Sequence, residues 1–559
     1  MEHLKGIIKT TLFSVVLVVF SGCNSETTEK ANLPNVVILF SDELAPGYLS
    51  CYGGDIPTPH LDQLAEQGMR FERAYTVSSM CTPSRFSLLT GMYPGRCKAD
   101  TFLETNPKNK PYNIAWNTHI ISSTQTIAKK LKKAGYTTGM VGKWHIGMGN
   151  EPLNLPTFAK NEDPESPEVQ EKLKEHQRMV AERIKTVGGF DYAASVLHGN
   201  YDYFPIKSLQ PHNFEWMTEG AKTFLEQQKN ADNPFFLYVA TTAVHGLAHQ
   251  LSVQSDVTMT LEGKRPDLAK YQTKRKTKYE ELKDLPGHVQ HLHSGMWFLD
   301  EHVGAVLRSL EENGLAENTL VIFMADHNVE PGKATSYEKG LHVPLLMKWP
   351  NRIPNNTVTA EIAQTVDMLP TLLNISGLAT DELTTVDGIS LLPLMNEPQA
   401  NVNRNYIYAE NGYSRAMIGE KYKYIAFRLP DDVLNQMKSG EMEYAPNYLN
   451  TFKQAHSQIA MKYHPHYFDP DQLYDLENDP YEMNNLTGNP EYQKILQVMK
   501  DSLQDVLSTF DHPYDLSVPE FMTTEKYKKM AEKTRNIGVD HIGWWTRDHG
   551  ENFQWPPAD

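Results

Sequence analysis

The chain of 559 residues is too long for one small domain, and its composition, 40% hydrophobic and 10% aromatic, is that of an ordered globular protein. Its 53 Lys and Arg against 69 Asp and Glu give a net charge of −16 at pH 7, which argues against nucleic acid as a partner. An acidic protein that binds an anion must gather positive charge locally, so single Lys and Arg residues within motifs carry more meaning than the total.

Residues 1–22 have the pattern of a secretion signal. Two lysines precede an apolar run at residues 12–20, which is too short to span a bilayer. The run ends in F-S-G-C, which resembles a bacterial lipoprotein box, so Cys23 is expected to be lipidated and residues 23–33 to form a polar tether. We therefore expect a lipid anchor in the bacterial outer membrane, on its periplasmic or cell-surface face, as the only contact with the membrane. The alternative is a cleaved signal that leaves a soluble periplasmic protein.

A buried strand is predicted at Asn35–Phe40, where apolar and β-branched residues follow one another without interruption. It leads directly into Asp42 and Glu43. Two acids at the end of a buried strand are costly unless they are solvated or bound to a cation. Ligands gather at the carboxyl ends of strands in open α/β sheets, so a metal site is favoured over a solvated turn.

A thiol stands at the start of a predicted helix within Cys81–Gly91. Thr82 suits the N-cap, Pro83 the first helical position and Gly91 the left-handed stop. Free backbone N–H groups and the positive end of the helix dipole should surround Cys81, where an anion binds readily and a thiol is acidified. The alternative is a buried cysteine ahead of an ordinary helix.

Three further predicted strands also end in polar residues. The strands are residues 137–141, 234–240 and 320–324, and each is followed within a few positions by acids or bases. Those residues are Lys143 and His145, then His245, then Asp326 and His327. Taken singly, the Lys143 and His145 pair fits a surface turn and a lone histidine fits the core. Random surface charge has no reason to collect at the ends of apolar runs, so we expect these side chains to meet at one site.

Several of these strings resemble the type I, formylglycine-dependent sulfatases of the alkaline phosphatase-like superfamily. They are C-T-P-S-R at 81–85, G-K-W-H-I-G at 142–147 and K-A-T-S-Y-E-K-G at 333–340. The resemblance implies that a formylglycine-generating maturation enzyme converts Cys81 to 3-oxoalanine. By the same resemblance, Arg85 is the partner of residue 81. It also implies that Lys143 and Lys333 bind sulfate and that His145 contacts the formylglycine hydrate.

The resemblance further implies a Ca²⁺ site, with Mg²⁺ as the alternative ion. The implied ligands are Asp42, Glu43, the modified Cys81, Asp326 and His327. In the implied reaction, one hydroxyl of the hydrate attacks sulfur, and deprotonation of the other, helped by His145, expels sulfate. His245 or Lys333 donates a proton to the departing sugar oxygen. The expected substrate is a sulfated polysaccharide or a derived oligosaccharide, such as algal ulvan or carrageenan or a host glycosaminoglycan.

The fold expected from these patterns is α/β, with a large mixed, mostly parallel sheet sandwiched by helices in residues 34–395. Beyond residue 396 the strands become shorter and more polar, and L-Y-D-L-E-N-D-P at 473–480 resembles the sulfatase C-terminal subdomain, an α+β unit with an antiparallel sheet. Residues 396–559 are assigned to that subdomain and end in an aromatic tail with Trp544, Trp545, Phe553 and Trp555. The tail either stacks on sugars or covers the core, and packing is favoured.

Two other functions fit parts of this pattern. One is a phosphatase or phosphonate hydrolase of the same superfamily, and the other is an inactive glycan-binding lipoprotein at the cell surface. With Cys23 lipidated and Cys81 converted, Cys51 and Cys97 remain, and in an oxidising compartment they either pair or stay free.

Overall fold

The computed structural model describes residues 33–245, 249–329, 332–378, 386–446, 460–461 and 463–535. The predicted signal peptide, Cys23, residues 23–32 of the tether and the four tail aromatics at 544, 545, 553 and 555 lie outside these ranges. No helix among the described residues is both long and apolar enough to cross a membrane.

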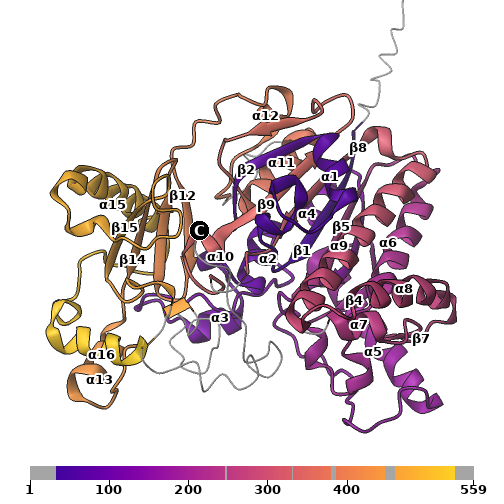
Figure 1. Cartoon of the computed structure of the whole chain (residues 1–559), viewed down its shortest axis with the longest axis horizontal. Helices are drawn as coiled ribbons and strands as arrows, with labels where there is room; N and C mark the ends of the chain where they lie inside the picture. The colour runs from indigo at the N-terminus through magenta and orange to yellow at the C-terminus, as the bar shows by residue number, and fades with distance from the viewer. Residues whose placement is uncertain are drawn as a thin grey trace, which may run out of the picture. The chain divides into compact units, whose positions relative to one another are not determined.

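A large mixed sheet forms the centre of the structure (Figure 1). Its strands are β1 (Asn35–Asp42), β2 (Met69–Tyr75), β3 (Thr137–Lys143), β4 (Tyr192–Leu197), β5 (Phe235–Val244), β8 (Thr319–Ala325), β9 (His342–Lys348), β10 (Thr357–Thr359) and β11 (Ala363–Gln364). Within the described ranges they lie in the order β10-β2-β9-β8-β1-β5-β3-β4, with β11 also beside β2. Strands β8, β1, β5, β3 and β4 are parallel, whereas β9 is antiparallel to both β8 and β2. The predicted mixed, mostly parallel sheet is confirmed.

Helices cover both faces of this sheet, and as a result every residue of β5 and β8 is buried. The helices are α1 (Pro59–Glu66), α2 (Cys81–Thr90), α3 (Asp100–Thr105), α4 (Ile127–Lys133), α5 (Pro167–Gly188), α6 (Phe214–Gln228), α7 (His249–Gln254), α8 (Gln272–Leu282), α9 (Gly287–Glu312), α10 (Glu338–Leu341), α11 (Met368–Ile375) and α12 (Leu392–Asn396). Helices α6 and α9 contact each other and β5, while α2, α4 and α11 form a second contacting group. A short hairpin, β6 (Met259–Thr260) and β7 (Gly263–Lys264), lies between α7 and α8 in the chain.

The parallel strands end at one edge of the sheet. Ser41 of β1 pairs with Ala325 of β8, and Asp42 pairs with Val244 of β5. On the next strand along, Gly142 of β3 pairs with Ala240. The polar residues that follow these strands in the sequence are therefore brought to a common edge, as the pattern of strand ends predicts.

A second, antiparallel sheet follows in the chain. Its strands are β12 (Ile407–Asn411), β13 (Ser414–Ile418), β14 (Tyr422–Phe427) and β15 (Asp471–Asp475), in that order. Along β14, Tyr424 and Ala426 face a cluster with Leu496 and Leu503, whereas Ile425 faces the opposite cluster. The two-residue alternation shows that both faces of this sheet are covered. The helices after β14 are α13 (Asp431–Ser439), α15 (Gln493–Leu507) and α16 (Glu525–Arg535), and both sheets belong to one compact unit, Pro34–Asp559.

Two sequence expectations are resolved by local geometry. Helix α2 begins at Cys81 with Met80 at its N-cap, so Thr82 is not the cap, although Gly91 does end the helix with a left-handed φ of 66°. The thiols of Cys51 and Cys97 are both free.

Candidate active site

Four of the predicted metal ligands meet at the carboxyl edge of the large sheet. The ligand atoms of Asp42, Cys81, Asp326 and His327 all lie within 4.8 Å of one another, and all four side chains are buried. Asp42 is the last residue of β1, Cys81 the first of α2, and the other two follow β8 directly. Asp42 and His327 are 285 positions apart in the sequence and nevertheless belong to one cluster.

The ring of His327 presents its Nε2 atom to this cluster. Its Nδ1 lies 2.7 Å from the carbonyl oxygen of Asn328, and a carbonyl only accepts hydrogen bonds, so Nδ1 carries the proton. The lone pair on Nε2 is then free to bind a cation. Nε2 lies 3.2 Å from Cys81 Sγ and 3.6 Å from Asp326 Oδ1.

Cys81 lies fully buried at the first position of α2, with its sulfur 3.5 Å from Asp42 Oδ1 and 3.7 Å from Lys143 Nζ. Burial, followed by the negative charge of Asp42, raises the pKa of the thiol well above its ordinary value. The expectation that the helix terminus acidifies this thiol is therefore wrong, because desolvation outweighs the helix dipole. An unmodified Cys81 would be a protonated thiol at neutral pH and a poor nucleophile.

Arg85 and Lys143 hold the two aspartates in place. The Arg85 guanidinium donates to Asp326 Oδ2 from Nε at 3.1 Å and from its terminal nitrogen at 2.8 Å, and it lies 3.6 Å from Asp42. Lys143 Nζ donates to the other carboxylate, Asp42 Oδ2. Burial acts to raise the pKa of Asp42, but neighbouring charges, Lys143 foremost, outweigh it and hold the pKa well below its ordinary value.

Glu43 lies outside the group of four and pairs with Lys333 instead. Lys333 Nζ donates to Glu43 Oε2 over 2.7 Å, and His245 Nε2 lies 3.6 Å from the same oxygen. Glu43 has a left-handed φ of 59°, which turns its side chain away from that of Asp42, while its own N–H donates to Asp326 Oδ1 at 2.9 Å. The structure thus gives the fifth predicted metal ligand a different partner.

The two histidines predicted to take part in catalysis, His145 and His245, are both uncharged at neutral pH. Burial, followed by the charge of Lys143, lowers the pKa of His145 well below 6.5, and burial and Lys333 do the same for His245. His145 Nδ1 is buried without a hydrogen-bond partner in the described part of the chain. His145 also has a left-handed φ of 53°, which is uncommon for a residue other than glycine and is typical of functional sites.

Asn411 holds two parts of the site together, and the sequence analysis missed it. Its side-chain oxygen accepts hydrogen bonds from Ser79 N–H at 3.0 Å and Ser78 Oγ at 2.8 Å, and its amide donates to the Thr335 carbonyl at 2.9 Å. Ser79 lies just ahead of Cys81, and Thr335 lies just after Lys333. An asparagine at the end of a polar strand carries no sequence signal for this role.

The Lys333 loop is also anchored in the small sheet. The residues that follow it, Tyr337 and Leu341, belong to the hydrophobic cluster on one face of that sheet. Lys423 of β14 lies buried between Glu338, at 2.6 Å, and Glu482, at 2.8 Å. The position of Lys333 therefore depends on residues of both sheets.

The charges of the site balance before any ligand binds. Three acids and three bases contribute: Asp42, Glu43 and Asp326 against Arg85, Lys143 and Lys333. The group of four supplies carboxylate oxygens and one imidazole nitrogen, donors that suit a divalent cation. Ca²⁺ takes about six to eight ligands, so these residues would leave positions for substrate oxygens. The residues present therefore fit a divalent cation, and adding one would give the site the positive charge that an anionic ester requires.

Comparison with known protein families decides the class of this site. The family model for sulfatases matches residues 34–378, which is more than half of the chain. The chain belongs to the sulfatase family. The sulfatase also matches the C-terminal model of N-sulphoglucosamine sulphohydrolase over residues 332–438, the stretch that joins the Lys333 loop to the small sheet.

Curated relatives of this sulfatase include an ulvan-active sulfatase of Formosa agariphila, 27% identical over 482 residues, covering 84% of this chain and 79% of the relative. Human arylsulfatase A is 29% identical over 538 residues, covering 86% of this chain and 90% of the relative. One solved structure, of a protein in complex with its substrate D-glucosamine-2-N,6-O-disulfate, superposes with a TM-score of 0.55 at 19% identity, covering 86% of this chain and all of that one. That last likeness shows the fold. Together with the family match, these relatives make the protein a sulfuric ester hydrolase.

Proposed function

We propose that this sulfatase releases sulfate from a sulfated polysaccharide or its oligosaccharides, with algal polysaccharides such as ulvan or carrageenan as the first candidates. The observation that carries the proposal is the meeting of Cys81, the Asp42–Asp326–His327 cluster and the two lysines at one buried site. The similarity to the ulvan-active sulfatase of Formosa agariphila supports the choice of substrate class.

We further propose that Cys81 works as formylglycine and that the cluster holds Ca²⁺. The hydrate of formylglycine would supply a hydroxyl nucleophile in place of the poorly reactive thiol. Asp42, Asp326 and His327 would hold the cation, which would polarise the sulfate oxygens.

The chain's own residues would then position and neutralise the ester. Lys143 is paired with Asp42 and Lys333 with Glu43, and both lysines would neutralise sulfate oxygens. Arg85 would keep Asp326 oriented through its two hydrogen bonds to Oδ2. Neutral His145, whose Nδ1 has no hydrogen-bond partner among the described residues and which lies within the influence of Lys143, Arg85 and Asp42, would accept a proton at position 81.

The test begins with protein from a host that carries the maturation enzyme. The tryptic peptide containing residue 81 is expected to have the mass of the aldehyde or its hydrate, and an active preparation with an intact thiol would contradict the proposal. Cys81→Ala is expected to abolish sulfate release while circular dichroism and melting temperature remain those of the wild type. Cys97→Ala is the matched control, because Cys97 is also buried and is not one of the four clustered residues.

Parallel assays separate this function from a phosphatase or phosphonate hydrolase. Sulfate and phosphate esters of the same 4-nitrophenyl leaving group are compared at equal concentration. Preference for the phosphate ester, or binding of sulfated glycans without sulfate release, would contradict the proposal. For localisation we propose a lipid anchor at Cys23, and Cys23→Ala is expected to move the protein from the membrane fraction to the soluble fraction.

A further inference from the structure

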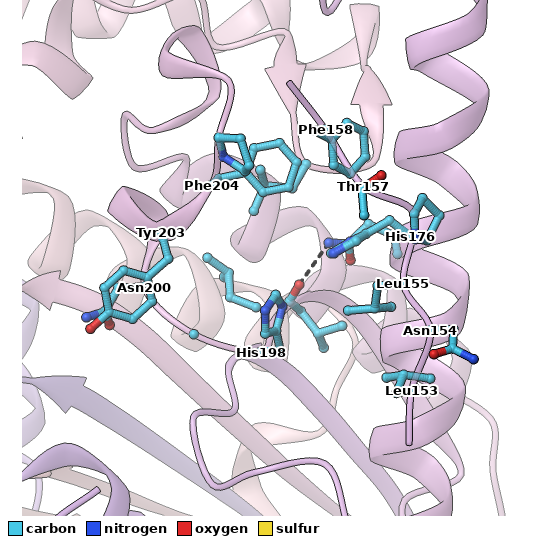
Figure 2. Close-up of a pocket in the computed structure, with 17 residues that line it drawn as sticks. Leu153, Asn154, Leu155, Thr157, Phe158, His176, His198, Asn200, Tyr203 and Phe204 are labelled. Atoms are coloured by element: carbon cyan, nitrogen blue, oxygen red, sulfur yellow. Dashed lines mark hydrogen bonds between the residues drawn. The ribbon is translucent and has the colours of Figure 1, made fainter. Parts of the chain in front are cut away.

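A cavity of about 550 Å³ lies at the carboxyl end of β4, the edge strand of the large sheet. Figure 2 shows the side chains of Leu153, Asn154 and Leu155 on one side of it and Asn200 and Tyr203 on the other, with Phe158 and Phe204 next to each other between the two sides. Val196, Leu197 and His198, at the end of β4 and just beyond it, form its base. The cavity has the size of a small-molecule site.

This cavity adjoins the site described above. Leu197, which lines it, pairs with Lys143 across the sheet, and the Trp144 N–H donates to the Leu197 carbonyl at 2.7 Å. Tyr203 follows in the next turn of the chain and is 66% exposed. Desolvation raises the pKa of its phenol, and Lys143 and Lys333 lie close enough for their charges to act on it in the opposite direction. A molecule held at the sulfate site can therefore extend past Tyr203 into the cavity.

One wall of the cavity is aromatic. The ring of Phe158 lies 4.9 Å from that of Phe204 and 5.8 Å from that of His176, measured between centroids, and His176 lies 5.6 Å from His198. Such a wall offers flat apolar faces that suit the C–H face of a pyranose ring. The amides of Asn154 and Asn200 add hydrogen-bonding groups.

The described residues that line the cavity include no Asp, Glu, Lys or Arg. Burial lowers the pKa of His176 to about 4 and also lowers that of His198, so both rings are neutral at pH 7. His176 is 5% exposed, and its Nδ1 is buried with no hydrogen-bond partner among the described residues.

We propose that this cavity binds an uncharged sugar ring of the glycan, adjacent to the ring that carries the sulfate. The inference rests on the proposed function and adds to it a preference for substrates in which an uncharged ring lies next to the sulfated ring. A hydroxyl-bearing neutral ring can hydrogen-bond to the amides of Asn154 and Asn200 and pack against the aromatic wall. A uronate or a second sulfate would have to shed water with no cation among the lining residues to receive it, because Lys172, whose Nζ lies 5.0 Å from the Phe158 ring centroid, is paired with Glu162 at 2.7 Å.

The test compares substrates of increasing length. The probes are 4-nitrophenyl sulfate, a panel of O-sulfated monosaccharides, and the best of these extended by one neutral hexose or by one glucuronic acid. Extension by the neutral hexose is expected to raise kcat/KM about 10-fold, mainly through KM, and extension by glucuronic acid to raise it less than about 2-fold. Equal gains from the two extensions, or no gain from either, would overturn the inference.

Two variants locate the effect in the cavity. Thr157→Trp fills the cavity from an exposed position, and Phe158→Ala removes part of the aromatic wall. Both variants are expected to bring the ratio of kcat/KM for the extended sugar to that for the unextended sugar close to one. The control is Leu251→Ala, at an exposed position on α7 that does not line the cavity, and it is expected to leave this ratio unchanged. A ratio that survives both cavity variants would place the neutral ring elsewhere. Absence of sulfate release from every probe, 4-nitrophenyl sulfate included, would instead contradict the proposed function, and this inference with it.

Discussion

Replacing Asn411 by alanine tests whether the small sheet positions the active site. Asn411 is fully buried and makes its hydrogen bonds to neither the clustered residues Asp42, Cys81, Asp326 and His327 nor the two lysines proposed to bind sulfate, so its effect must pass through the segments it holds. Asn411→Ala removes the acceptor of the Ser79 N–H and of the Ser78 hydroxyl, together with the donor to the Thr335 carbonyl.

The expected cost follows from these three bonds. The Ser79 N–H would be left buried without its acceptor, at a cost of about 1–3 kcal/mol, and the lost bonds to the hydroxyl and carbonyl bring the total to about 2–4 kcal/mol. The released segments carry position 81 and Lys333, and a displacement of about 1 Å costs up to about 100-fold in rate. We expect kcat/KM to fall about 10- to 100-fold, with a lower melting temperature.

The assay is sulfate release from 4-nitrophenyl sulfate, normalised to the fraction of position 81 that mass spectrometry finds as aldehyde. That normalisation separates misplacement from incomplete maturation. Asn374→Ala is the matched control, because Asn374 is exposed on α11 and far from these segments in the chain. A normalised kcat/KM within about twofold of the wild type would refute the positioning role, even if the melting temperature fell.

Three further predictions concern the cation, the pH and the thiols. Asp326→Asn removes a predicted metal ligand and the main partner of Arg85. The affinity for Ca²⁺, measured by calorimetry, and kcat/KM should each fall at least about 100-fold. Exhaustive chelation of the wild type should also lower its activity. Burial lowers the pKa of His302 to about 4, so between pH 6.5 and 4 the unfolded chain binds more protons than the folded chain. Stability is therefore lost as the pH falls through that window, by at most about 3 kcal/mol for this group. His302→Phe should flatten the pH dependence of the denaturation midpoint, and an unchanged slope would contradict this prediction. Alkylation of the unreduced, denatured protein should label both Cys51 and Cys97, whereas a disulfide-linked peptide would show that they pair.

The parts of the structure that were predictable are those that local pattern determines. Continuous apolar runs predicted β1, β3, β5 and β8, and the rule that parallel strands end at one edge predicted that Asp42, Lys143, His245 and Asp326 meet. Helix α6 also follows its apolar spacing from Phe214 to Gln228. These features need no knowledge of distant contacts.

The remainder depended on contacts that no local pattern encodes. The partner of Glu43 is Lys333, 290 residues away, and the hydrogen bond that ties Ser79 to Asn411 spans 332 residues. The acidity of Cys81 was predicted with the wrong sign because the helix terminus is visible in the sequence, whereas complete burial is not. Likewise, residues 151–185 carry little signal alone and become part of a cavity wall only against the loop that follows β4.

The anchoring of the Lys333 loop in the small sheet limits how this enzyme can be re-engineered. Tyr337 and Leu341 are packed in the core of that sheet, and Lys423 joins Glu338 to Glu482. Grafting the C-terminal region of a relative onto this chain would therefore exchange part of the scaffold of the reaction centre along with the outer surface. Chimeras are expected to retain turnover only when the segment around residues 332–341 and the sheet that receives it come from the same parent.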